Sequence, residues 1–492
     1  MRVLLVHPSP LAYSELSLRL EPLGLERVAA ALEAAGHDVR LLDLQIFRHA
    51  DYRRELETFA PRAVGFSVNY LANVPEVVDL ARQTRARHGG PFVFVGGDSA
   101  SFIAAEVLDH AGGAIDCVIR GEGEVIAPLV VEAIGDPKLE TLPGVVTGHG
   151  AGPSPSVLRD LDRHLPARHL ARRRHKYFIG ALDPCASIEL TRGGPSDCSF
   201  GSAWTFYGRT YRQSSPEGAV EDLARIREPN VFIVDDVAFI QGEHGFAIAR
   251  EIERRRIRKQ YYLETRCDVL IKNQELFAYW KRLGLRDMFL GIEALDEEAL
   301  RLHRKRVTLN ESLRALEIAR ALGLTVAINI IADPGWDEAR FRAVREWART
   351  VPELVHLTVA TPYPGTELWL TESRQLTTRD YRLFDAQHAV LPTKLPLGRY
   401  YEEVVSTRAV LNRKHLGWSA VRRHGLPALR AAARGQTNYL RMLCKLGTVH
   451  NPELLYADHA RPVRYEMRPP RPLAGPRPSK PDNLLLLPGV VV

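Results

Sequence analysis

The chain has 492 residues, and a usual size of about 100–200 residues per domain predicts about three domains. A hydrophobic content of 45% with 25% charged residues is ordinary for a globular protein and excludes an intrinsically disordered chain. The net charge of +7 is small for this length, and the basic residues form short runs without base-reading or stacking motifs. We therefore expect no nucleic-acid partner.

Cysteine usage indicates a reducing compartment, because the five cysteines show no paired framework of the disulfide-rich kind. The apolar run that opens the chain (MRVLLVHPSP) is too short for a signal peptide and is typical of a strand. No run of about 18 apolar residues occurs, so the sequence predicts no membrane-spanning helix. We expect a cytoplasmic protein. The cysteines are Cys117, Cys185, Cys198, Cys267 and Cys444.

Residues 1–140 alternate short β-type runs with helical patterns, the latter at 23–35, 75–88 and 104–110. This alternation predicts an α/β domain with a doubly wound, Rossmann-like parallel sheet, whose ligand lies beyond the carboxyl ends of the strands. The β-type runs are Val3–Val6, Asp38–Leu42, Ala63–Val68, Phe92–Val95 and Asp116–Ile119.

The ends of these strands carry polar residues and glycines that we expect to bind a ligand. Glycine at such a point lets the backbone turn sharply or approach a ligand closely. The candidate residues are Ser9, Ser67, Asn69, Gly96, Gly97, Asp98, Arg120, Gly121 and Glu122.

Residues 141–180 contain Gly, Pro and basic residues without sustained periodicity and are predicted to be a linker. A second β/α series over 181–395 has about six units, which predicts a partial (β/α)6 barrel with its site at the strand carboxyl ends. Residues 396–467 read as helices rich in Arg and aromatic residues, and the Pro-rich tail 468–492 as disordered. The expected strands are Ser187–Leu190, Val231–Val234, Tyr261–Glu264, Met288–Leu290, Thr325–Ile331 and His356–Ala360.

Charged and polar residues follow these strands as well. Unpaired charge in the mouth of a barrel is unfavourable, so the set favours a ligand site over isolated salt bridges. The residues are Asp235, Asp236, Arg266, Glu293 and Asn329.

One glycine-rich stretch, Ala186–Arg209 (ASIELTRGGPSDCSFGSAWTFYGR), follows the first strand of this series. It resembles the loop of radical S-adenosylmethionine (SAM) enzymes in which three cysteines, spaced C-x3-C-x2-C, hold a [4Fe-4S] cluster. Cys198 occupies the middle position, whereas Gly194 and Gly201 occupy the flanking positions. Glycine has no side chain and cannot ligate iron, so we expect no normal [4Fe-4S] cluster in this chain.

Over residues 1–465 the sequence resembles the cobalamin (B12)-binding radical SAM methyltransferases, in the group that includes hopanoid C-3 methylase. The stretches that carry the resemblance are HPSPLAYSELSLRLEPLGLE, VIRGEGE, TFYGRTYR, VFIVDDVAF and TPYPGTE. The resemblance implies a B12-binding first domain that holds cobalamin base-off, since the D-x-H-x-x-G signature is absent. It also places Arg266 and Glu293 near the amino-acid moiety of SAM, and Asp235 or Asp236 near the mouth. Asp98 stands where relatives usually have His.

The same resemblance implies transfer of a methyl group to an unactivated carbon of a small molecule or lipid, with hopanoid biosynthesis as the setting. A lipid acceptor suits a basic, aromatic C-terminal region at a membrane surface. A reductase is the expected redox partner. Because the cluster ligands are incomplete, three hypotheses stay open: a descendant that has lost the radical step, a polar cobalamin- and SAM-dependent methyltransferase, or a non-enzymatic binding partner of an intact paralogue.

Overall fold

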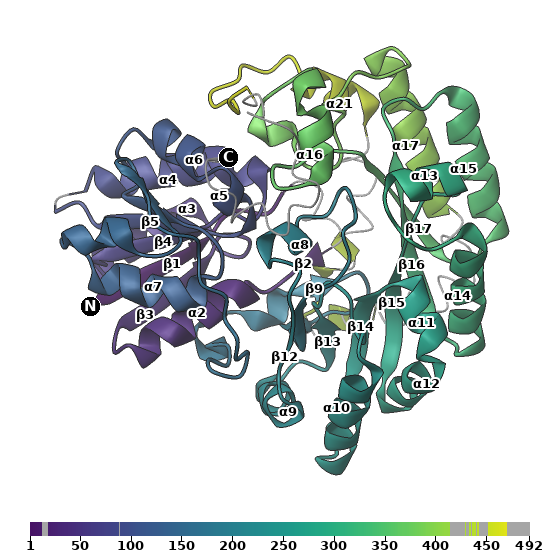
Figure 1. Cartoon of the computed structure of the whole chain (residues 1–492), viewed down its shortest axis with the longest axis horizontal. Helices are drawn as coiled ribbons and strands as arrows, with labels where there is room; N and C mark the ends of the chain where they lie inside the picture. The colour runs from purple at the N-terminus through teal and green to yellow at the C-terminus, as the bar shows by residue number, and fades with distance from the viewer. Residues whose placement is uncertain are drawn as a thin grey trace.

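The computed structural model describes residues 1–11, 18–87, 89–413, 429, 432–433, 435–438, 440–441 and 451–469. Two α/β bodies lie side by side, the first at the left and the second at the right of Figure 1. Most of residues 414–450 of the predicted helical region, with Cys444, and the predicted tail beyond residue 469 fall outside the described residues. Within the described part of the chain, no helix is long and apolar enough to cross a membrane.

The first body contains a seven-stranded sheet in the order β3-β1-β4-β5-β6-β7-β8. Its first five strands in this order are parallel, whereas β7 and β8 are antiparallel additions at one edge. The strands are β1 Arg2–His7, β3 Asp38–Asp43, β4 Ala63–Ser67, β5 Phe92–Gly96, β6 Cys117–Ile119, β7 Val145–Thr147 and β8 Gly150–Ala151.

Helices cover both faces of this sheet, which confirms the predicted doubly wound fold. Alternate residues of a strand point to opposite faces, and Val3 and Leu5 pack in one core cluster with α2 and α7. Leu4 and Val6 pack on the other face with α3, α4 and α6. The helices are α2 Leu23–Ala34, α3 His49–Thr58, α4 Val74–Arg85, α5 Asp98–Phe102, α6 Ala104–Ala111 and α7 Gly123–Glu132.

The boundary predicted at residue 140 lies too early, because β7 and β8 belong to the first sheet. The rest of the predicted linker, 152–180, contains the short helices η3 Arg168–Leu170 and η4 Arg174–Lys176. It also contains β9 Phe178–Ile179, which pairs with β2 Leu18–Arg19. The segment is therefore packed against the first body.

The second body contains six parallel strands in chain order, β10-β13-β14-β15-β16-β17. The first and last strands are not paired with each other, so the barrel is open on one side, as predicted. The strands are β10 Cys185–Ile188, β13 Asn230–Ile233, β14 Gln260–Thr265, β15 Leu285–Glu293, β16 Thr325–Ala332 and β17 Leu354–Val359. The helices are α8 Ala203–Phe206, α9 Pro216–Arg225, α10 Gly242–Arg254, α11 Cys267–Lys272, α12 Gln274–Leu283, α13 Glu297–Leu302, α14 Leu309–Ala321, α15 Glu338–Thr350, α16 Glu367–Glu372, α17 Leu397–Arg413 and α21 Pro452–Asp458.

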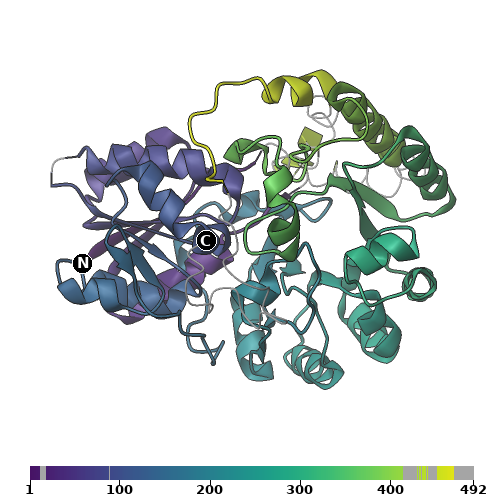
Figure 2. The ribbon, with the colours of Figure 1, turned by 45° about the horizontal axis from the view of Figure 1, so that its top comes forward.

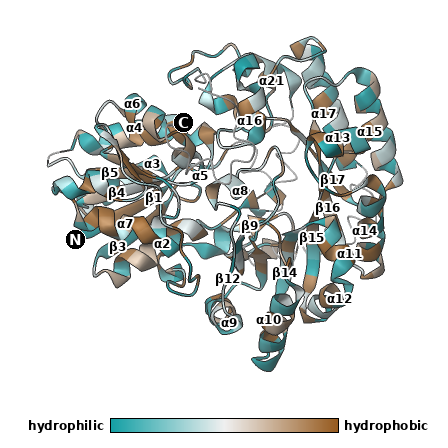
Figure 3. Cartoon of the chain, viewed as in Figure 1, coloured by the Kyte–Doolittle hydropathy of each residue, from teal (hydrophilic) through white to brown (hydrophobic). Residues whose placement is uncertain are grey.

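Hydropathy follows this layering. Hydrophobic residues gather on the strands and on the helix faces turned toward them, while outward helices such as α10 and α15 carry many hydrophilic residues (Figure 3). Strands buried on both faces read as continuous apolar runs, which is why they were visible in the sequence.

A buried ionic network joins the two bodies. The Arg168 guanidinium donates to both carboxylate oxygens of Asp222 at 2.7 Å and to the Ser187 carbonyl at 2.8 Å, and it pairs with Glu21. Burial raises the pKa of the neighbouring Glu26 well above its usual value, and the charge of Glu21 raises it further. The network therefore fastens the segment that enters α2 to helix α9 of the second body.

After α21 the chain returns to the first body. Residues 459–469, which we call the C-terminal strap, run from α21 back across the first body (Figure 2). Tyr465 and Met467 are buried in the same core cluster as α4 and α6. The Tyr465 hydroxyl donates to Asp79 and accepts from Arg82, both at 2.7 Å.

Candidate functional site

The carboxyl ends of the two sheets face each other. Ser202, directly before α8, donates through its hydroxyl to Asp98 after the end of β5, at 3.1 Å. Burial, and then the charge of Glu264 at the end of β14, raise the pKa of Tyr70, which follows β4. Because ligands of parallel α/β sheets bind beyond these ends, the region between them is the candidate site.

Four side chains define this region, which we call the interdomain recess: Tyr70 and Asp98 from the first body, and Asp236 and Glu264 from the second. Solvent reaches 53% of Tyr70, and Asp236 is exposed as well. Burial is nevertheless the main cause that raises the pKa of each of the four groups. Solvent therefore reaches these side chains although protein atoms surround them.

The carboxyl groups of the recess have pKa values raised toward neutral pH. Burial and the charge of Asp236 raise the pKa of Asp98 to about 6, against the hydrogen bond from Ser202. Burial and the charge of Glu189 raise the pKa of Asp236 to about 6. Burial, then Glu293 and Asp236, raise the pKa of Glu264 to about 7. Perturbed carboxyl groups that share a recess are typical of functional sites.

The loop that resembles a cluster loop lies at the edge of this recess. Strands β11 Thr191–Gly193 and β12 Tyr211–Gln213 pair antiparallel and form the base from which residues 194–210 project. Glu122 clamps this base, since its buried carboxylate accepts from Arg192 and Arg212 of the two strands. The prediction that Glu122 contacts a cofactor is therefore not supported, because its oxygens are used to join the two bodies.

The residues present do not fit a [4Fe-4S] cluster. Among the described residues, no group of three or more His, Cys, Asp or Glu side chains could hold a metal ion. Cys198 is the sole thiol of the 194–201 loop, and the flanking positions are glycines. Cys185 and Cys267 are buried, and burial raises the pKa of Cys267 to about 11, which disfavours the thiolate that iron requires.

Several other predicted residues of the second body are engaged with the chain itself. Asp235 is buried and accepts from the Leu190 N–H at 2.8 Å and the Thr191 hydroxyl at 2.6 Å. Burial raises its pKa to about 7. It braces the turn from β10 into β11 and lies behind the recess, whereas its neighbour Asp236 faces it.

Arg266 follows β14 directly, Glu293 is the last residue of β15, and Asn329 lies within β16. Arg266 pairs with Asp268 at 2.9 Å and donates to the hydroxyl of Ser196 in the loop at 3.1 Å. Glu293 pairs with Lys305 at 3.2 Å, and its charge reaches Glu264.

The Asn329 amide donates to Thr358 at 2.8 Å, while its buried carbonyl oxygen has no hydrogen-bond partner among the described residues. A buried acceptor without a donor is unfavourable unless a ligand supplies one. The amino groups of SAM would supply such a donor, so this part of the barrel fits SAM.

The predicted residues of the first body divide into two groups. Ser9 donates to Glu76 and Ser67 pairs with His7 at 2.9 Å, so both are satisfied within the chain. Arg120 donates to the Gly152 carbonyl at 3.4 Å, beside β8, and Gly121 N–H to Ser101.

Asn69, Gly97 and Asp98 instead lie at the recess. Gly97 is required by the chain itself, because its φ is +113° and a Cβ there would meet the Asn69 side-chain oxygen at 2.6 Å. At the neighbouring Gly96 a Cβ would make only ordinary contacts with Ile119.

Tyr70 is the residue that sequence reasoning missed. It follows Asn69 directly and is one of the exposed large side chains of the described chain. The available signal was an aromatic residue directly after a polar strand end, which is equally typical of a core residue.

The phenol of Tyr70, together with the exposed amide of Asn69, offers a flat face and hydrogen-bonding groups. The corrin ring of cobalamin, with its amide side chains, fits these groups, and they lie at the switch point between β1 and β4.

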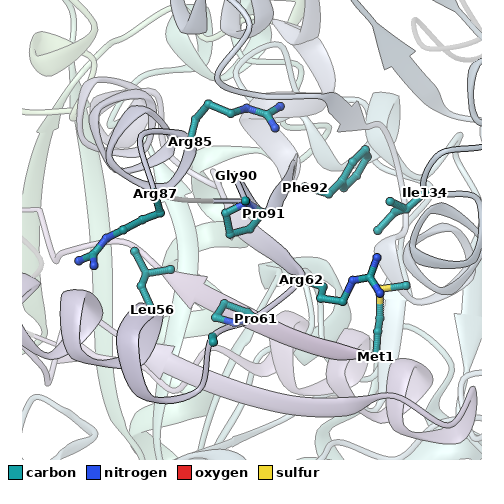
Figure 4. Close-up of a pocket in the computed structure, with 12 residues that line it drawn as sticks. Met1, Leu56, Pro61, Arg62, Arg85, Arg87, Gly90, Pro91, Phe92 and Ile134 are labelled. Atoms are coloured by element: carbon teal, nitrogen blue, oxygen red, sulfur yellow. The ribbon is translucent and has the colours of Figure 1, made fainter.

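A separate cavity of about 380 Å³ lies at the opposite, amino-terminal end of the first sheet (Figure 4). Met1, Arg62 and Phe92 line it together with Arg85 and Arg87. Arg85 pairs with Asp116 and Arg87 with Glu57. This cavity is remote from the strand ends that carry the perturbed groups and is not part of the recess.

Comparison with known proteins identifies both bodies. The B12 binding domain matches residues 12–131, and the radical SAM superfamily matches residues 188–348. The chain is 59% identical over 475 residues to hopanoid C-3 methylase of Methylococcus capsulatus, which covers 96% of this chain and 92% of that protein. It is 23% identical to an anaerobic magnesium-protoporphyrin IX monomethyl ester cyclase of Rubrivivax gelatinosus, over 82% of this chain and 76% of that one.

Solved structures share the fold. The radical SAM methyltransferase TsrM from Kitasatospora setae, with cobalamin and a [4Fe-4S] cluster bound, matches with a TM-score of 0.60 and 19% identity. The match covers 77% of this chain and 76% of TsrM. The relatedness to the methylase confirms the resemblance found in the sequence. The chain belongs to the hopanoid C-3 methylase family of B12-binding radical SAM methyltransferases, as a member in which Gly194 and Gly201 replace two of the three cluster cysteines.

Proposed function

We propose that this chain transfers a methyl group from SAM, by way of cobalamin, to a nucleophilic atom of a lipid or natural-product acceptor, without a radical step. The observation that carries the proposal is the interdomain recess. It contains carboxyl groups that titrate near neutral pH and a barrel mouth suited to SAM, beside a loop with a single cysteine. Without a cluster to generate a radical, the acceptor atom must itself be electron-rich, either a heteroatom or an electron-rich carbon.

Cobalamin, when bound, supplies the methyl-transfer chemistry, while the protein supplies binding and proton management. A nucleophilic acceptor loses a proton as it gains the methyl group, and that proton needs a receiver. Glu264, whose pKa is about 7, matches a general base that works near neutral pH. Asp98 and Asp236, with pKa values of about 6, can accept a proton and release it again near the same pH.

The walls of the site suit an acceptor with a large apolar body. Burial raises the pKa of Tyr70, Tyr207 and Tyr262, so each of these phenols stays neutral. The charges of Asp236 and Asp98 act on Tyr207, and that of Glu264 on Tyr262, which places both rings beside the recess. Neutral aromatic side chains bind flat hydrocarbon surfaces. A polycyclic lipid such as a hopanoid, the acceptor class named for the methylase relative, fits this lining.

The test is anaerobic reconstitution with iron, sulfide and cobalamin, followed by reduction and addition of SAM and a hopanoid alcohol. We expect stoichiometric cobalamin, formation of S-adenosylhomocysteine and no 5′-deoxyadenosine. Glu264→Gln should lower methyl transfer at least about tenfold, in line with the loss of a general base, while leaving cobalamin bound. The exposed Glu275→Gln on α12 serves as the matched control.

Formation of 5′-deoxyadenosine by the native chain would refute the polar chemistry. The missing iron ligands also favour a second candidate, a binding partner of an intact paralogue. That role predicts bound cobalamin or SAM with no S-adenosylhomocysteine released. Failure to bind cobalamin at all would refute both.

A further inference from the structure

We propose that the cavity at the amino-terminal end of the first sheet binds a small organic anion of the phosphate-ester class. Its volume of about 380 Å³ falls within the range of about 300–1,000 Å³ that is typical of small-molecule sites (Figure 4). Strand β4 runs from this cavity toward the interdomain recess, and its five residues, at about 3.3 Å each, separate the two regions by about 15 Å. The inference concerns a second site and does not depend on the proposed function.

The charged side chains of the cavity are positive. Three of its lining residues are the arginines Arg62, Arg85 and Arg87, and none of the lining residues that the structure describes is acidic. Arg85 ends α4 and Arg87 lies two residues beyond it, whereas Arg62 directly precedes β4. The three guanidinium groups thus come from two separate segments around the cavity (Figure 4). A cation would meet like charge here, so the lining suits an anion.

Arg62 carries the charge that the protein does not compensate. Its guanidinium makes no ion pair with a described residue, and its side chain is exposed. The backbone at this point is fixed, because the Arg62 N–H donates to the Arg2 carbonyl and its own carbonyl accepts from the Phe92 N–H, both at 2.9 Å. A fixed strand entrance therefore presents this guanidinium to the cavity.

Arg85 and Arg87 are held in place and still have donors to offer. Arg85 pairs with Asp116 through Nη2, and Arg87 pairs with Glu57 through Nη2 at 3.0 Å. Asp116 is itself fixed, since it accepts from the Val93 N–H at 2.7 Å. A guanidinium has five N–H groups, and within the described part of the chain the Nε and Nη1 groups of both arginines have no hydrogen-bond partner. Arginines oriented in this way suit bidentate donation to phosphate oxygens.

The remaining walls are apolar, which favours an organic anion over an inorganic one. Leu56, Pro61, Pro91, Phe92 and Ile134 contribute hydrocarbon surface to the lining. An inorganic ion would leave this surface against water, whereas a ligand with an apolar body would cover it. The two prolines have no backbone N–H, so the arginine side chains must supply the donors at this part of the wall.

The test is isothermal titration calorimetry of the full chain with phenyl phosphate, at one fixed ionic strength because salt screens such contacts. We expect one site per chain, and Arg62→Met should weaken binding at least about tenfold, the effect of losing one charged hydrogen-bonding partner. Arg53→Met is the matched control, because Arg53 is an exposed arginine of α3 that does not line the cavity, and this variant should bind as the native chain does. Phenol, which has the ring without the anion, should give no measurable heat.

Vesicle flotation separates the two sources of a phosphate ester. Flotation of the native chain with phosphatidic acid vesicles but not with phosphatidylcholine vesicles, lost in Arg62→Met, would assign the cavity to a lipid headgroup. Binding of phenyl phosphate without flotation would assign it to a soluble phosphate ester. Both results support an anion site.

The inference is overturned if the native chain does not bind phenyl phosphate at millimolar concentration, or if the native chain and Arg62→Met bind it equally. If Arg62→Met does not fold, Arg87→Met takes its place, because the pair between Arg87 and Glu57 is exposed and contributes little to stability. Cobalamin content, measured on the same samples, should be equal in all variants, which separates a failure here from a failure of the proposed function.

Discussion

Replacing Glu122 by Gln should weaken the junction between the two bodies. Glu122 is 5% exposed, and its carboxylate accepts from Arg192, from Arg212 at 2.8 Å and from the Leu158 N–H at 2.7 Å. Gln keeps the shape of the side chain but removes the charge and turns an amide N–H₂ toward an arginine. The two arginines would then lie buried with less compensation.

The expected loss of stability depends on which interaction partners each arginine still has in the variant. Arg192 retains Glu124 and Glu189, both at 2.8 Å. Arg212 retains only the Leu158 carbonyl and the Tyr207 ring, because its Nε and Nη2 have no hydrogen-bond partner. Removing one partner of a buried ion pair costs about 3–5 kcal/mol. Because Arg192 keeps two other carboxylates, we expect the free energy of unfolding to fall by about 3 kcal/mol.

The assay is urea unfolding followed by circular dichroism. With an m value of about 3 kcal/mol/M, the midpoint should fall by about 1 M. Glu57→Gln is the matched control, because its pair with Arg87 at 3.0 Å is exposed and should contribute at most about 1 kcal/mol. A loss at Glu122 no larger than at Glu57 would refute the reasoning. In a double-mutant cycle with Arg212→Met, the losses should fall short of additivity by at least about 1 kcal/mol.

The remaining predictions concern the ionic network, the recess and the strap. Burial raises the pKa of Glu26 well above its usual value, because the charged form of this carboxyl group is disfavoured there. Glu26→Gln should therefore change the free energy of unfolding by less than about 1 kcal/mol. Glu21→Gln breaks two arginine pairs and should lower it by about 3 kcal/mol; equal losses in urea unfolding would contradict this. The pKa of Glu264 is raised from 4.5 to about 7, so its ionisation destabilises the fold as pH rises through that interval. The free energy of unfolding should therefore fall with pH in this interval, by up to about 1.4 kcal/mol per pH unit, and Glu264→Gln should abolish this contribution. Urea unfolding at several pH values measures it, and parallel pH profiles of the native chain and the variant would contradict it. Tyr465→Ala should lower the free energy of unfolding by about 3 kcal/mol, because the ring is 5% exposed in a shared core. Tyr456 is 54% exposed, so Tyr456→Ala should leave the free energy of unfolding unchanged. Calorimetry on both variants measures this, and similar shifts of their unfolding midpoints would refute the packing argument.

The sequence was most informative where strands are buried on both faces. The predicted run Thr325–Ile331 is the strand Thr325–Ala332, and the other five runs of the second series likewise fall on strands of the observed sheet. Apolar β-branched runs of this kind have few alternatives. The strand β7, Val145–Thr147, was read as linker because it is three residues long and flanked by turns. Only its pairing with β6 makes it part of the sheet.

The sequence predicts site residues from their positions at strand ends, but it does not show which groups they contact. Asp98 and Glu122 are both acidic and both follow strands of the first sheet, so the sequence ranks them alike. The structure separates them, because the partner of Glu122 lies 70 residues away in another sheet. Long-range pairing of this kind leaves no local pattern. The exposed ring of Tyr70 was missed for the same reason, since an aromatic residue at a strand end looks like core until its surroundings are known.

The C-terminal strap bears on how this protein is made. The core that packs against α4 and α6 includes Trp369, Tyr381, Phe384, Tyr465 and Met467, all of which leave the ribosome long after the first sheet is complete. Part of the apolar surface of the first domain therefore stays uncovered until these later residues have been synthesised. Such intermediates are prone to aggregation, so the nascent chain is the stage at which chaperones are needed most. A recombinant fragment ending after the first sheet would preserve that exposed state and should be expressed only together with the residues that cover it.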